Sequence, residues 1–136
     1  MTKKEAIAKI VKLRRLAEGT NSTPEANNAR AAIRKIAADH KLSETDLMQG
    51  VKAEAFDELV SQLDTVVRKH RNEVPSTVFE VFEKIKSDVT EENKADLLVK
   101  IVSSVRIGGM IFGFNETFVK IKDTVTEVLK KYDLHI

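Results

Sequence analysis

The chain has 136 residues, of which 42% are hydrophobic and 32% charged, and its net charge at pH 7 is +2. It contains no cysteine, which excludes disulfides, thiolate nucleophiles and cysteine-bound zinc and is typical of a reducing compartment. No segment approaches the roughly 18 apolar residues of a membrane span, and the start of the chain lacks the apolar stretch of a signal peptide. Because the chain has only two prolines and five glycines, its composition predicts an all-α protein. The lack of cysteine, of a signal peptide and of a membrane span predicts that it is cytoplasmic.

Charge is distributed unevenly along the chain. Residues 1–52 have a net charge of +5, whereas residues 53–136 have a net charge of −3. We therefore expect two regions, a basic helical hairpin at residues 1–50 and an acidic four-helix bundle at residues 53–136.

Two helices are predicted in the basic region, the first at residues 2–18. Gly19 is expected to end it in a positive-φ conformation, and Thr23 is expected to be the N-cap of the second, with Pro24 in its first turn. Small apolar residues at helical spacing favour an antiparallel hairpin of these helices. The apolar positions are Ala6, Ile7, Ile10, Leu13, Leu16 and Ala17 in the first helix and Ala26, Ala29, Ile33, Ile36 and Ala37 in the second.

The remaining chain predicts a short helical connecting turn at residues 43–46 and then four longer helices. The third helix ends before Pro75, and the fourth covers residues 76–87. Thr90 is expected to cap the fifth and Asn115 the sixth. Their apolar stripes are Phe56, Leu59, Val60, Leu63, Val66 and Val67; Val78, Phe79, Phe82 and Ile85; Leu97, Leu98, Ile101, Val102 and Val105; and Phe118, Ile121, Val125, Leu129 and Tyr132.

The segment from Arg106 to Phe114 is the least regular part of the chain. Its three glycines predict that the fifth helix ends at Gly108-Gly109 and that a loop or a short extended segment follows. The segment also carries the apolar residues Met110, Ile111, Phe112 and Phe114. We expect them to be buried as a plug of the bundle. If exposed, they would instead form a contact patch for a partner protein or for a second copy of the chain.

Residues 9–46 form one recognisable pattern. A lysine-rich helix ending in Leu-Ala is followed by a Thr/Ser-Asn turn, a Glu-Ala pair, an alanine-rich helix and a His-Lys-Leu-Ser segment. This pattern resembles the bacterial and phage family catalogued as domain of unknown function 2786. The resemblance implies a protein encoded by a phage or mobile element, which would act in the host cytoplasm. It implies no catalytic residues, and the chain lacks the His-Glu-x-x-His motif of the metallopeptidase-like segment found in some longer relatives. The matching positions are Leu13, Leu16, Ala17, Asn21, Glu25, Ala26, Ala29, Leu42 and Ser43.

Basic side chains on the predicted hairpin are the first candidate binding site. At 100° per residue, Lys4, Lys12 and Arg15 lie together on the first helix, opposite its apolar stripe. Arg34 and Lys35 lie away from the apolar stripe of the second helix. Clustered Lys and Arg bind nucleic-acid phosphates or an acidic protein surface. The alternative is an ordinary solvated helix face.

Other polar residues predict local roles. Arg14 projects beside the apolar stripe of the first helix, so we expect it to pair with a carboxylate such as Glu18 or Glu25. The alternative is that its stem lies along the apolar surface with the guanidinium in solvent. His40 is expected to be partly buried, and His70 and His135 to lack the neighbouring second ligand that a zinc site needs. No arrangement typical of a zinc site, a nucleophile or a nucleotide-binding loop is present, so we expect no metal, no cofactor and no enzymatic activity.

The leading hypothesis is a small non-enzymatic protein that contacts nucleic acid or a nucleoprotein complex through its basic hairpin. Its basis is the charge difference between the two regions. The alternative is an inhibitor or adaptor that binds a host enzyme or defence complex through the acidic bundle and its apolar segment.

Overall fold

The computed structural model describes residues 1–136 and contains six α-helices and no strand, with 79% of the residues helical. It confirms the all-α fold class. The chain divides into two compact units, Met1–Val51 and Lys52–Ile136, and the division falls inside α3 (Glu44–Lys69). The regions predicted from the sequence were 1–50 and 53–136. None of the six helices is long and apolar enough to cross a bilayer.

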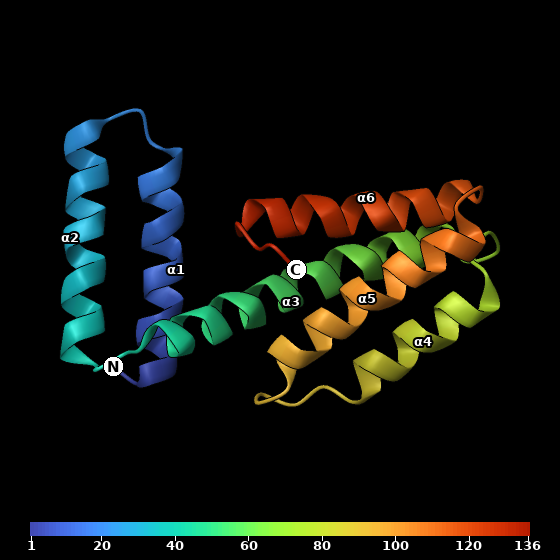
Figure 1. Ribbon diagram of the computed structural model, residues 1–136, viewed down its shortest axis with the longest axis horizontal. Helices are drawn as coiled ribbons and strands as arrows, with labels where there is room; N and C mark the ends of the chain where they lie inside the picture. Colours follow the sequence, from blue (N-terminus) through green and yellow to red (C-terminus); the bar gives the residue numbers. More distant parts are fainter. The chain divides into compact units, whose positions relative to one another are not determined.

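The first unit consists of α1 (Lys3–Gly19), α2 (Thr23–Asp39) and the first turns of α3. Figure 1 shows α1 and α2 side by side as an antiparallel hairpin. Ala17, Ala26 and Ala29 form a buried cluster between them, with Leu13 packed against it. Alanine at these positions lets the two helices approach closely. The start of α3 packs against α1 where Gly50 meets Ile7, and a Cβ at Gly50 would lie only 1.9 Å from Ile7 Cγ2.

The turn between α1 and α2 differs from the prediction at both helix ends. Gly19 is the last residue of α1 and has no positive φ; Thr20 follows in an extended conformation. The N-cap of α2 is Ser22 and not Thr23, because the Ser22 side chain accepts a hydrogen bond from the backbone N–H of Glu25. With the cap one residue earlier, Pro24 lies in the first turn, where its missing N–H removes no intrahelical hydrogen bond.

The predicted connecting turn and third helix are a single helix of 26 residues, α3. Ser43 and Asp46 form a reciprocal pair at its start: each backbone N–H donates to the side-chain oxygen of the other residue, at 3.1 Å in both cases. This arrangement, a capping box, satisfies two N–H groups that the helix itself leaves without a partner. Since nothing after it interrupts the helix, α3 continues to Lys69.

The second unit contains the rest of α3 with α4 (Ser76–Ser87), α5 (Lys94–Phe112) and α6 (Glu116–Lys131). In Figure 1, α5 lies between α4 and α6, and both contact it. Most of the predicted apolar stripes point into this bundle. Its buried side chains include Phe56, Leu59, Leu63, Val67, Phe82, Ile85, Leu97, Leu98, Ile101, Val102, Phe118, Ile121, Val125 and Tyr132.

Both ends of α5 differ from the prediction. Thr90 does not cap it: residues 91–93 form a turn, and the Thr90 N–H donates to Asn93 Oδ1 at 2.7 Å, so that the helix begins at Lys94. The helix also does not end at Gly108-Gly109 but continues to Phe112, so this part of the segment is neither loop nor strand. Gly108 is buried, and a Cβ there would lie 2.7 Å from Phe118 Cζ. Glycine is present at this position because the Phe118 ring packs directly on the helix backbone.

A polar junction joins the end of α3 to the start of α6. Glu73 Oε2 accepts a hydrogen bond from the buried Thr117 hydroxyl at 3.1 Å and lies 3.0 Å from His70 Nδ1. These contacts hold the pKa of the Glu73 carboxyl below its ordinary value. Asn115, confirmed as the N-cap of α6, also donates through Nδ2 to the Glu73 carbonyl. His70 is therefore part of the structure that positions α6, a role that the sequence did not predict.

Candidate functional site

The exposed face of α2 carries amide and cationic side chains. Arg30, Arg34 and Lys35 are all exposed, as are Asn27 and Asn28. No aspartate or glutamate occurs from residue 26 to residue 38, and the first carboxylate after this stretch is that of Asp39. The buried alanines of α2 lie on its other face, against α1. The helix therefore presents an uninterrupted cationic surface to solvent, which we call the α2 face (Asn27, Asn28, Arg30, Arg34 and Lys35).

The cations of α1 are less uniform than the sequence predicted. Lys4 and Lys12 are exposed. Arg15 is half-buried, with Nε and Nη2 shielded from solvent, so it does not belong to the same exposed surface. Arg14 pairs with Glu18 at 3.5 Å, one of the two partners expected for it. Of the five predicted cations, the structure exposes four: two on α1 and two on the α2 face.

Half of the six carboxylates in the first unit are engaged in local contacts. Glu18 pairs with Arg14, and Asp46 pairs with Lys3 at 3.0 Å. Glu25 accepts a hydrogen bond from the Thr20 hydroxyl at 2.9 Å. The other three, Glu5, Asp39 and Glu44, are exposed, and of these only Asp39 lies on α2, at its last residue.

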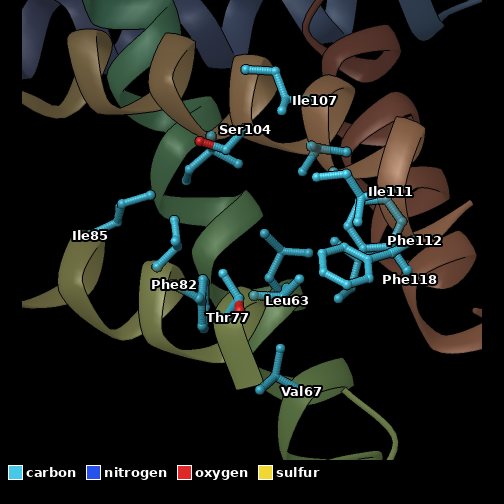
Figure 2. A pocket seen from close by; sticks show the side chains of 16 residues that line it. Leu63, Val67, Thr77, Phe82, Ile85, Ser104, Ile107, Ile111, Phe112 and Phe118 are labelled. Carbon is cyan, nitrogen blue, oxygen red and sulfur yellow. The ribbon is translucent and has the colours of Figure 1, made fainter. Parts of the chain in front are cut away.

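An apolar groove in the second unit is the other candidate site, and the sequence did not predict it. Figure 2 shows side chains from α3, α4, α5 and α6 around it, among them Leu63, Phe82, Ile111 and Phe118. The groove has a volume of about 260 Å³, and its only side-chain hydroxyls are those of Thr77 and Ser104. Periodicity identifies apolar stripes on single helices but not a gap between them, so no signal in the sequence could have located it.

The apolar residues near the end of α5 are exposed, and the expectation that they plug the bundle was wrong. Met110 is 87% exposed, Ile111 68% and Phe114 104%, while Ile107, one turn earlier, is 61% exposed. Phe112 alone turns inward, with its ring centroid 5.9 Å from that of Phe118. Phe112 packs against Phe118 beneath this end of α5, whereas the other four side chains face solvent. The four exposed residues are called the α5 stripe below.

Comparisons with protein-family models, with curated proteins and with solved structures found no match. The resemblance of residues 9–46 to a phage and bacterial family, and the origin that it implies, stay predictions from the sequence.

Proposed function

We propose that this protein is a non-enzymatic nucleic-acid-binding protein and that the α2 face contacts the phosphate backbone. The observation that carries the proposal is a run of thirteen residues on one helix, 26–38, that exposes two arginines, one of the predicted lysines and two asparagines but no carboxylate. Binding to a polyanion depends on releasing its counterions, and each Lys or Arg at a phosphate contributes to that release.

Side-chain chemistry supports a nucleic acid over an acidic protein as the ligand. Arginine binds phosphate through two parallel hydrogen bonds, and asparagine amides donate to phosphate oxygens and sugars. None of the three cations of the α2 face is held by an ion pair within the unit. Aromatic side chains are absent from residues 1–55, so the proposed contacts are to the backbone and not to stacked bases.

The proposal is tested by fluorescence anisotropy with duplex DNA, single-stranded DNA and RNA at two salt concentrations. We expect binding that weakens steeply with salt, and an Arg34→Glu/Lys35→Glu variant that binds at least about tenfold more weakly, with a salt slope reduced by about two. The matched control is Lys84→Glu/Lys100→Glu, which makes the same charge change at exposed positions of the second unit. Equal affinity of the hairpin variant and the wild type at low salt would contradict the proposal.

The adaptor hypothesis differs in the surface that it uses. It places the interface on the second unit, so it predicts that the Arg34→Glu/Lys35→Glu variant of the first unit retains the partner. The adaptor hypothesis would be favoured if the chain bound no nucleic acid but recovered a host protein in a complex that survives nuclease and high salt.

A further inference from the structure

The α5 stripe is an apolar surface that nothing else in the second unit covers. Ile107, Met110 and Ile111 follow the i, i+3, i+4 spacing of one face of α5, and Phe114 lies in the turn directly after the helix. Their exposed fractions range from 61% to 104%. No charged residue lies between Ile107 and Phe114. Helix faces of this composition are normally packed against another apolar surface, and contiguous exposed apolar patches mark interaction sites.

The stripe adjoins the apolar groove. Ile107 and Ile111 belong to both, since they line the groove and are also more than half exposed. Val81 on α4, 39% exposed, lines the same groove. Met110 and Phe114 lie outside the groove lining, and Met110 instead borders a second recess, with Val102 of α5 and Leu129 of α6. The second unit therefore carries an exposed apolar ridge at the end of α5 next to an apolar recess.

We propose that a second copy of this chain covers this surface, so that the α5 stripe of each copy packs against the stripe and groove of the other. A two-fold pair is self-complementary: residue i of one copy contacts residue j of the other, and the reverse contact forms at the same time. One two-fold rotation therefore places the ridge of each copy against the recess of the other. A foreign protein would have to supply a matching ridge and recess of its own.

Composition and area agree with a homodimer. Homodimer interfaces are more apolar than transient ones, which keep the charged residues that steer and select a foreign partner. Phe114 exposes about 150–250 Å², and the other three side chains together expose about 130–260 Å² at about 60–120 Å² for a whole aliphatic side chain. The stripe therefore exposes about 400 Å² per copy, which is within the range of functional surface patches. Pairing two copies buries about 800 Å² from the stripes alone, and the groove walls add to this toward the about 1,000 Å² that a specific interface needs.

The full-length chain is tested by sedimentation velocity over a range of concentrations. We expect twice the mass of the chain at micromolar concentration, and a monomer at the same concentration for Ile111→Glu, because the glutamate would be buried without a partner at the centre of the interface. Val99→Glu is the matched control: it lies on the same helix, is 37% exposed and lines no part of the groove, so it should remain a dimer. Circular dichroism checks that each variant is folded.

Cysteine cross-linking gives an independent measurement because the chain has no cysteine of its own. Met110→Cys should form a disulfide-linked dimer under mild oxidation, whereas Val119→Cys, on α6 and 40% exposed, should not. A wild-type chain that stays monomeric at high micromolar concentration, or an Ile111→Glu variant that stays dimeric, would overturn the proposal. A monomer that captures a foreign protein through Ile111 would do the same. These outcomes do not depend on whether the α2 face binds nucleic acid.

Discussion

Two glycines of α5 differ in how closely the buried Phe118 ring packs against them. Gly108 and Gly109 are neighbours with the same helical backbone but different surroundings. A Cβ at Gly108 would lie 2.7 Å and 2.9 Å from two atoms of the buried Phe118 ring, whereas the nearest atom to a Cβ at Gly109 is 3.9 Å away. The first glycine is required by a close contact, and the second is not.

Alanine substitution of these two glycines should therefore have opposite effects on stability. Alanine is favoured over glycine inside a helix by about 1 kcal/mol, so Gly109→Ala should stabilise the protein by up to that amount. Gly108→Ala gains the same helix preference but overpacks a rigid ring, which costs about 1–3 kcal/mol, so the net effect should be destabilising. Urea denaturation followed by circular dichroism measures both. A stabilising Gly108→Ala would show that Phe118 does not pack on the α5 backbone.

The ion pair between Asp64 and Lys86 makes the stability of the second unit depend on pH. Lys86 Nζ donates to Asp64 Oδ1 at 2.7 Å, and this hydrogen bond holds the pKa of Asp64 below its ordinary value of 3.8 and raises that of Lys86 above 10.5. A carboxylate with a lowered folded-state pKa stabilises the fold above its unfolded pKa, and that contribution is lost as the pH falls through the folded value.

Asp64→Asn should accordingly be less stable than the wild type at neutral pH. The difference between the two proteins should shrink as the pH falls below about 3.8, where aspartate in the unfolded chain becomes protonated. It should also shrink at alkaline pH as the solution approaches and passes the raised pKa of Lys86. The measurement is the urea midpoint of both proteins across this pH range. A constant difference would show that the pair does not control the pH dependence.

At the scale of helices, short polar side chains set the boundaries. Thr2, Ser22 and Asn115 each accept a hydrogen bond from a backbone N–H three residues later, and each precedes a helix by one residue. The sequence predicted Thr23 as the N-cap of α2, and the structure places the cap one residue earlier, at Ser22.

Substitution of these two residues distinguishes the caps. Ser22→Ala should destabilise the first unit by about 1 kcal/mol, because the Glu25 N–H loses its acceptor at 3.4 Å. Thr23→Ala should change stability by less than about 0.5 kcal/mol, since Thr23 is already inside the helix. Hydrogen exchange of the α2 amides and urea denaturation both report the effect. The reverse order of the two variants would assign the cap to Thr23.

For the whole molecule, the two proposed surfaces lie on different units and should be separable. The α2 face belongs to Met1–Val51 and the α5 stripe to Lys52–Ile136. If two copies associate through the stripe, each dimer carries two α2 faces. A long duplex that contacts both then binds more tightly than a single contact allows, because the second contact is intramolecular.

Ile111→Glu should therefore weaken binding to a long duplex by at least about tenfold and leave binding to a duplex too short for two hairpins unchanged. Anisotropy titrations with the two duplex lengths at one salt concentration measure this difference. An equal loss on both lengths would indicate damage to the hairpin. No loss on either would indicate that the two copies bind independently.

The sequence by itself determined the all-α fold, the helix spanning Ser76 to Ser87 and the cap at Asn115, and it named Glu18 as one of two expected partners of Arg14. Each depends on residues within about four positions of one another, where helical spacing and side-chain chemistry are sufficient. Only the tertiary structure decided that α5 continues through two glycines, because Phe118, ten residues after Gly108, contacts its backbone. It also decided that Met110 and Phe114 face outward, since periodicity reveals an apolar stripe but not the surface that covers it. The apolar groove is likewise a product of four helices packed together, and no one of their sequences contains it.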